Sequence, residues 1–284
     1  MNIVSLQLTD YEIKNSTYLK EVKPELILYD SPETMAKALT RKLLKNSLIK
    51  QSEGKPFTIA LCGGNSPQVI YREFAQSEFT KWIPWKSIHL FWGDDRCVPP
   101  EHEESNYRMA RDLFIKSVPI PNENVHRILG ENNPELEVKR YEEEILSIFI
   151  PEKEEPIAFD WIFLGLGEDG HTASLFPGKG LISEGANICT VAKHPQTGQK
   201  RITMTLDTLN KARQVSFLSI GKKKATVIGQ IMKGSRESEQ YPAKYVNPGP
   251  GRLNWIIDQE CAEEIKKKLL IDRNTLKGPL GKDL

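Results

Sequence analysis

The sequence lacks the features that mark secreted, membrane-spanning or zinc-binding proteins. Its four cysteines are far apart and none forms a Cys-x-x-Cys pair: Cys62, Cys97, Cys189 and Cys261. This spacing argues against a zinc site and fits a reducing, cytoplasmic compartment. No apolar run approaches the ~20 residues that cross a bilayer, and the residues after Met1 lack the basic region and apolar core of a secretory signal. We therefore expect a cytoplasmic protein without a membrane partner.

The sequence also lacks an excess of charge of either sign. Lysine and arginine together number 39 against 38 aspartates and glutamates, a formal net charge of +1. No broad basic surface for nucleic acid is expected, so any anion must be bound locally. The 284 residues suffice for one large α/β domain or two small ones. No internal repeat or second boundary is evident, so we expect an N-terminal extension at 1–24 and a single domain at 25–284.

Strand-like apolar runs alternate with helical patterns from residue 25 to residue 269. Strands are predicted at 25–29, 57–62, 88–92, 161–166, 188–192, 201–206, 215–220 and 253–257, and helices at 32–50, from 66, 104–116, 134–149, 209–212, from 222 and 258–269. The first helix has Ser31 as its N-cap and proline at its first position. This alternation predicts an α/β fold whose mostly parallel sheet has helices on both faces.

We expect the chain to be organised around the strand at 161–166 and the turn that follows it. Three glycines in the segment 165–170 allow a sharp turn or a close approach to a ligand. The same turn carries two carboxylates and an imidazole, Glu168, Asp169 and His171. Open α/β sheets bind ligands at the carboxyl ends of their strands, so we expect the chemistry here.

The glycine spacing Gly-x-Gly-x-x-Gly at 165–170 also occurs in dinucleotide-binding proteins. Those proteins carry an acidic residue about 20 positions later, whereas the candidate strand at 188–192 has no carboxylate at its end. Glu168 and Asp169 would also repel a pyrophosphate. We therefore do not favour a dinucleotide site.

A second strand-to-helix turn consists of Gly63, Gly64, Asn65 and Ser66. Glycines let backbone N–H groups converge, and a helix N-terminus adds partial positive charge, so the turn can form a phosphate cradle. An ordinary tight turn with a serine N-cap fits the same residues. The local pattern leaves both interpretations open.

Further ligand-type residues follow other predicted strands. Asp94, Asp95 and Arg96 follow the strand at 88–92, although a surface Asp–Arg pair explains them equally well. Alternation along 201–206 places Arg201 on one face with two threonines. Lysines at 222–224 occupy a helix start, where cations are disfavoured; at least one of them is expected to face a bound anion.

Four segments together resemble the 6-phosphogluconolactonase family. They are GEDGHTASLFPG at 167–178, GDDRCVP at 93–99, SNY at 105–107 and RITMT at 201–205. The similarity covers roughly residues 25 to 265, in the family's order. It implies a Rossmann-like α/β fold shared with glucosamine-6-phosphate deaminases and ribose-5-phosphate isomerases. It also implies hydrolysis of 6-phosphogluconolactone in the pentose phosphate pathway, without a metal or organic cofactor, by a monomer or small homo-oligomer.

The sequence departs from the family pattern at two places. GGNSP at 63–67 replaces the usual GGSTP, but Ser66 retains a hydroxyl and the Asn65 amide can still donate. Asp95 replaces the usual glutamate between Asp94 and Arg96, which places this second carboxylate on a shorter side chain.

Lactone hydrolysis requires a base for water, a partner for the oxyanion and groups that hold the substrate. His171 is the predicted general base, because an imidazole with an unperturbed pKa of about 6.5 suits proton removal near neutral pH. Asp169 or Glu168 is expected to orient it. Arg96 is a candidate for stabilising the oxyanion or holding sugar hydroxyls, and Asp94 for binding hydroxyls or fixing Arg96.

The phosphate end is assigned to Gly63, Gly64, Asn65 and Ser66, with Arg201 and Lys224. The resemblance selects Lys224 among the three lysines. A covalent route through Ser174 is not favoured, because the segment lacks the Gly-x-Ser-x-Gly elbow. Two other functions remain open: a sugar-phosphate isomerase or amino-sugar deaminase on the same fold, and a non-catalytic sugar-phosphate sensor.

Overall fold

Six parallel strands form the main sheet of this computed structural model, which describes residues 24–149, 157–179, 187–249 and 251–275. In spatial order they are β1 (Glu25–Tyr29), β9 (Arg252–Asp258), β8 (Gln214–Ser219), β5 (Trp161–Leu164), β2 (Phe57–Leu61) and β3 (Ile88–Trp92). The predicted mostly parallel sheet is therefore confirmed. The expected extension at 1–24 lies, except for its last residue, outside the described residues.

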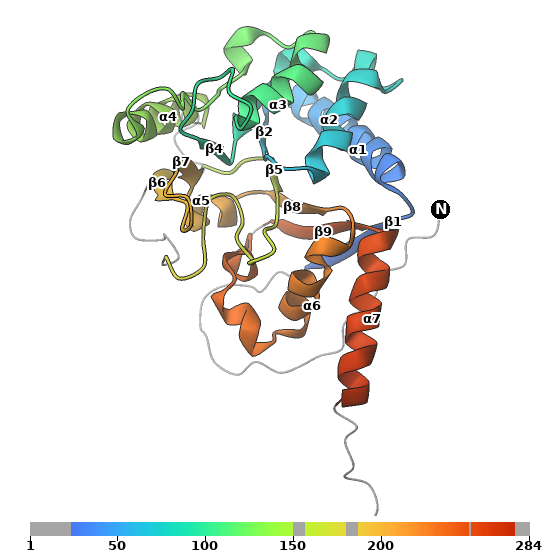
Figure 1. Ribbon diagram of the computed structural model, residues 1–284. Coiled ribbons are helices and arrows are strands. Elements are labelled where there is room, and N and C mark those ends of the chain that lie inside the picture. Colours follow the sequence, from blue (N-terminus) through green and yellow to red (C-terminus); the bar gives the residue numbers. More distant parts are fainter. Residues whose placement is uncertain (1–23, 150–156, 180–186, 250, 276–284) are drawn as a thin grey trace, which may run out of the picture.

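Helices cover both faces of this sheet, as predicted (Figure 1). On one face lie α1 (Pro32–Ser52), α2 (Ser66–Gln76) and α3 (Asn106–Leu113), and on the other α6 (Ala225–Lys233) and α7 (Gln259–Thr275). The Ser31 side chain accepts the Thr34 N–H and so caps α1, as expected of a serine before proline. All residues of β2, β5 and β8 are buried, which explains why β2 and β5 are almost continuously apolar, whereas β8 also buries three polar residues, Gln214, Ser216 and Ser219.

A second, antiparallel sheet contains β4 (Asp94–Arg96), β7 (Lys200–Met204) and β6 (Cys189–Lys193), with β7 in the middle. The sequence pattern did not separate β6 and β7 from the parallel strands and did not predict β4. The prediction that one strand continues to Leu206 is wrong. The Thr205 hydroxyl instead caps a short helix, α5 (Leu206–Asn210), which begins earlier than predicted.

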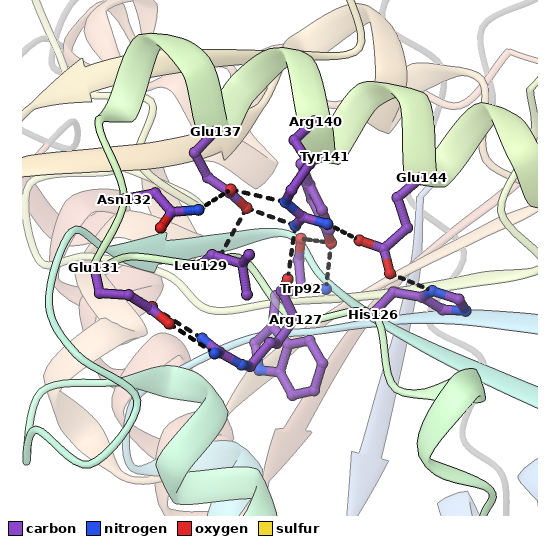
Figure 2. Close-up of polar contacts among 10 residues, drawn as sticks. All are labelled: Trp92, His126, Arg127, Leu129, Glu131, Asn132, Glu137, Arg140, Tyr141 and Glu144. Carbon is purple, nitrogen blue, oxygen red and sulfur yellow. Dashed lines mark hydrogen bonds and ion pairs between the residues drawn. The ribbon is translucent and has the colours of Figure 1, made fainter.

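Helix α4 (Pro134–Phe149) joins the edges of the two sheets. The Tyr141 hydroxyl accepts the Trp92 N–H at 2.9 Å and donates to the Trp92 carbonyl at 3.0 Å, at the open edge of β3. Glu142 accepts the N–H groups of Ile188 and Cys189, at the start of β6. Figure 2 shows Tyr141 on the side of α4 that also presents Glu137, Arg140 and Glu144 to the 126–132 segment. These contacts fix the end of β3, two residues before Asp94.

The strand order places four carboxyl ends side by side, those of β3, β2, β5 and β8. From β2 the chain moves outward to β3, whereas from β5 it moves to β8 and β9 in the opposite direction. The direction therefore reverses between β2 and β5. A crevice opens beyond the strand ends at such a reversal, and ligands bind there in open α/β sheets.

Candidate active site

A cavity of about 430 Å³ lies beyond the carboxyl ends of these four strands. Every predicted site residue except Asp169 lines it: Gly63, Gly64, Asn65, Ser66, Asp94, Arg96, His171, Arg201 and Lys224. Its volume falls in the range of small-molecule sites. The structure thus brings together residues that come from turns as much as 161 positions apart, between Gly63 and Lys224.

Asp169 lies behind the imidazole of His171. Its Oδ1 is 2.6 Å from His171 Nδ1 and also accepts the His171 backbone N–H at 3.1 Å. Burial raises the pKa of Asp169, but the hydrogen bonds and charge of His171 outweigh burial and lower it to about 2. The Glu168 carboxylate points elsewhere, 3.6 Å from the Lys224 ammonium. The geometry therefore favours Asp169 over Glu168 as the group that orients His171.

The glycines of this turn make room for side chains. A Cβ atom on Gly167 would lie 2.1 Å from Nδ1 of His171. Gly170 has φ +81°, and a Cβ there would come within 2.3 Å of the Tyr241 ring. The glycine spacing that resembles a dinucleotide fingerprint thus leaves space for the imidazole of His171, the carboxylate of Asp169 and the ring of Tyr241.

The residues after His171 connect this turn to β4 and β7. Ala173 lines the cavity with φ +48°, the only positive φ of a non-glycine residue in the described ranges. Such a conformation costs about 1–3 kcal/mol and occurs mainly at functional sites. The buried Ser174 hydroxyl donates to Asp94 Oδ2 at 2.7 Å, and Thr203 Oγ1 accepts the Ser174 N–H at 3.1 Å. Ser174 therefore fixes Asp94, and it does not line the cavity that contains His171.

Asp95 points away from the cavity and holds the start of α3. Its carboxylate accepts the N–H groups of Arg96, Asn106 and Tyr107 at 2.8–3.0 Å. Burial raises its pKa to about 6, against the lowering effect of these hydrogen bonds. The aspartate that replaces the family's glutamate thus has a structural role here.

Asn106 is a cavity residue that the sequence analysis missed. Its Nδ2 donates to the Asp94 carbonyl at 2.9 Å. Its Oδ1 lies where a Cβ on Gly63 would be only 1.9 Å away, so Gly63 has to be glycine for this amide to fit. Asn106 directly follows the N-cap of α3, Ser105, and no local signal distinguishes it from other residues at a helix start.

Two arginines face each other on adjacent strands, since Arg96 pairs with Arg201 in the register of β4 and β7. Arg201 is 9% exposed, and its Nε has no hydrogen-bond partner; the same holds for Arg96 Nε. Arg96 donates through NH1 to the Glu104 carbonyl at 2.5 Å. Burial and, after it, the Arg96 charge lower the pKa of Arg201. Within the described part of the chain, neither guanidinium has a carboxylate at ion-pair distance, although the charges of Asp94, Glu104 and Asp95 act on Arg201 from further away.

The loop after β2 and the lysines after β8 meet across the cavity. Ser66 is the first residue of α2, and its hydroxyl accepts the Ile220 N–H at 3.1 Å. It therefore does not act as the expected N-cap; Asn65 holds that position without a side-chain cap bond. Lys224 ends a short 3-10 helix, η5 (Lys222–Lys224), directly before α6, and Lys223 also lines the cavity.

The described residues favour neither a metal site nor a cysteine nucleophile. Among the described residues, no cluster of three or more His, Cys, Asp or Glu side chains could hold a metal ion. Burial raises the pKa of the Cys62 thiol, which keeps it protonated at the cavity wall.

In the described ranges, no helix has the length and apolar character needed to cross a membrane.

Comparison with known proteins relates the chain to sugar-phosphate enzymes. Residues 30–255 match the family model of glucosamine-6-phosphate isomerases and 6-phosphogluconolactonases. A 6-phosphogluconolactonase of Haemophilus influenzae is 40% identical over 218 residues, 77% of this chain and 91% of the relative. The structure of 6-phosphogluconolactonase from Trypanosoma cruzi superposes with a TM-score of 0.74 at 26% identity, over 87% of this chain and 99% of that one. A monomeric glucosamine-6-phosphate deaminase shares the fold, with a TM-score of 0.70 at 19% identity over 84% of this chain and 99% of that one.

Proposed function

Because the chain belongs to the glucosamine-6-phosphate isomerase/6-phosphogluconolactonase family, we propose that it hydrolyses 6-phospho-D-glucono-1,5-lactone to 6-phosphogluconate. The observation that carries the proposal is one cavity lined both by an imidazole that a carboxylate orients and by two guanidinium groups that face each other without an ion-pair partner among the described residues. The pair His171–Asp169 suits water activation. Arg96 and Arg201 supply positive charge that awaits an anionic ligand.

In the proposed reaction His171 acts as general base. Asp169 contacts Nδ1 of His171. Nε2 of His171 can then remove a proton from a water molecule while the water oxygen attacks C1 of the lactone. The carbonyl oxygen gains negative charge in the tetrahedral intermediate, and Arg96 stabilises it. The bond between C1 and the ring oxygen then breaks, and His171 returns its proton to that oxygen. The products are a hydroxyl group and a carboxylate.

The phosphate is assigned to the residues that combine backbone N–H groups with positive charge. Gly63, Gly64, Asn65 and Ser66 lead into the N-terminus of α2, where partial positive charge favours a dianion. Lys224 lines the same cavity with its side chain only 25% exposed. Arg201 adds a buried guanidinium whose Nε has no hydrogen-bond partner. A phosphate would give this buried cation a direct charge-assisted hydrogen bond.

The isomerase or deaminase alternative shares the fold and the family model. The relative at 40% identity is named a lactonase, whereas the deaminase at 19% supports the fold alone. A sugar-phosphate sensor would have no use for an imidazole held at 2.6 Å by a carboxylate. Both alternatives are therefore less well supported than the lactonase. For a lactonase of this substrate, we propose the pentose phosphate pathway as the metabolic context.

The decisive experiment measures lactone lifetime. The lactone is generated in situ from glucose 6-phosphate, its hydrolysis is followed by acid release, and the spontaneous rate is subtracted. We expect the protein to accelerate hydrolysis and His171→Ala to lower kcat by roughly two to four orders of magnitude. Arg201→Ala should mainly raise KM. Ammonia release from glucosamine 6-phosphate would favour the deaminase, and 6-phosphogluconate binding without acceleration would favour the sensor.

A further inference from the structure

The ring of Phe176 lies against two side chains of the candidate active site, His171 and Arg201, and against His194 beside them. Its centroid is 5.1 Å from the His171 ring, 5.1 Å from the His194 ring and 5.6 Å from the Arg201 guanidinium carbon. Phe176 is 3% exposed and comes only five residues after His171. One buried aromatic ring therefore contacts both the proposed base and a proposed anion-binding cation.

Arg201 has few other means of support. It lies opposite a second cation, Arg96, and its Nε has no hydrogen-bond partner. Among the described residues, no carboxylate lies at ion-pair distance from it, although Asp94, Glu104 and Asp95 act on it from further away. The guanidinium lies directly over the face of the Phe176 ring. Cation–π attraction is strongest when the cation is removed from water, as it is for this arginine.

His171 is held on two sides. Asp169 fixes Nδ1 through the 2.6 Å contact, but a single hydrogen bond leaves an imidazole free to swing about that nitrogen. Phe176 packs against the ring with an interplanar angle of 46°. This second contact restricts the direction in which Nε2 points.

His194 supports Phe176 from another side, edge to face at 73°. Its Nδ1 accepts the N–H groups of Gln196 and Thr197, at 3.3 and 3.2 Å, in the turn between β6 and β7. Strand β7 also carries Arg201. Phe176 therefore connects the turn after β5 with the hairpin that supplies the arginine.

We propose that Phe176 is a positioning residue that holds the Arg201 guanidinium and the His171 imidazole in a fixed mutual arrangement. The proposal rests on the function proposed above. It predicts that the aromatic face of residue 176, and not merely its apolar volume, contributes to substrate binding and turnover.

The test compares Phe176→Leu with Phe176→Tyr and a matched control, Phe57→Leu. Leucine keeps an apolar side chain but removes the ring, whereas tyrosine keeps the ring, and Phe176 borders a second cavity that has room for the hydroxyl. Phe57 is 2% exposed and starts β2, at the opposite end of that strand from the site. Phe57→Leu therefore shows what the same loss of a ring does in the core, away from the site.

We expect Phe176→Leu to lower kcat/KM about 3- to 30-fold, mainly through KM, as loss of a cation–π contact would. Calorimetric binding of 6-phosphogluconate should weaken by a similar factor. Phe176→Tyr should stay within about threefold of the wild type, and Phe57→Leu should leave kcat/KM unchanged. In the Arg201→Ala background, Phe176→Leu should have a much smaller effect on KM.

Two results would overturn the proposal: an unchanged kcat/KM in Phe176→Leu, or the same loss with and without the arginine. Equal losses in the leucine and tyrosine variants would also contradict a role for the aromatic face. If the wild-type protein does not hydrolyse the lactone, the proposed function fails instead, and the binding measurement alone then tests the contact between Phe176 and Arg201.

Discussion

Replacing Asp169 by asparagine gives the sharpest test of the proposed base. The carboxylate contacts His171 Nδ1 at 2.6 Å, and its pKa falls from 3.8 to about 2 in this environment. A tenfold change in proton affinity corresponds to about 1.4 kcal/mol. The Asp169 side chain is 51% exposed, so solvent screening reduces the benefit of the charged contact to about 1 kcal/mol. Loss of this charge alone would cost about fivefold in rate.

Asparagine has a second and larger effect. Its amide nitrogen can donate to Nδ1, and the ring proton then resides on Nε2, the atom that has to accept a proton from water. Loss of the correct tautomer costs on the order of 10⁴ in kcat in the His–carboxylate pair of serine proteases. Asp169→Ala leaves Nδ1 free to keep its proton, so we expect this variant to retain more activity than Asp169→Asn.

The assay is hydrolysis of freshly generated lactone, with the spontaneous rate subtracted at each pH. Glu168→Gln is the matched control, because it neutralises the neighbouring carboxylate, which pairs with Lys224 and not with His171. We expect its kcat to stay within about threefold of the wild type, in line with a weak exposed ion pair. Turnover of Asp169→Asn near the wild-type value, or a greater loss in Glu168→Gln, would refute the assignment of Asp169.

Three further predictions concern stability. Burial and the charge of the neighbouring His126 imidazole lower the pKa of His89 from 6.5 to about 4. As the pH falls, His89 therefore takes up a proton in the unfolded chain before it does so in the folded protein. The free energy of unfolding should accordingly decrease between pH 6.5 and pH 4. His89→Gln should flatten this dependence in denaturant titrations, and an unchanged slope would exclude His89 as its source. Tyr141→Phe leaves the edge of β3 at Trp92 without its partner and should cost about 1–3 kcal/mol of unfolding free energy; a loss below about 0.5 kcal/mol would contradict this account. Gly63→Ala should destabilise by about 1–3 kcal/mol through its clash with Asn106, and adding Asn106→Ala should restore most of the loss in the same titrations.

Most site residues converged because they follow strands of one parallel sheet, whereas Arg201 reaches the site from β7 of the antiparallel sheet. The strands at 57–61, 88–92, 161–164 and 214–219 were recognisable as apolar runs, since both faces of a parallel sheet are covered. Their carboxyl ends necessarily share one edge. For this reason the residues predicted after each strand could be assigned to one site before any contact was known.

The choice between adjacent carboxylates depended on the turn itself. Glu168 and Asp169 are chemically equivalent neighbours in the sequence. Only the backbone of the turn, with glycine at 167 and a positive φ at Gly170, directs Asp169 to the imidazole and Glu168 to Lys224. Side-chain direction in a tight turn is set by backbone angles, which composition does not reveal.

The sequence by itself determined the parallel α/β sheet and the strand ends after which His171 and Arg96 follow, because periodicity and apolar runs are local properties. The tertiary structure alone decided the antiparallel sheet in which Arg96 and Arg201 face each other. A three-residue polar strand such as β4 has no periodic signal of its own, and its partner β7 lies about a hundred positions away. The placement of Asn106 in the site likewise depended on contacts outside its helix, the hydrogen bonds to Asp94 and Asp95.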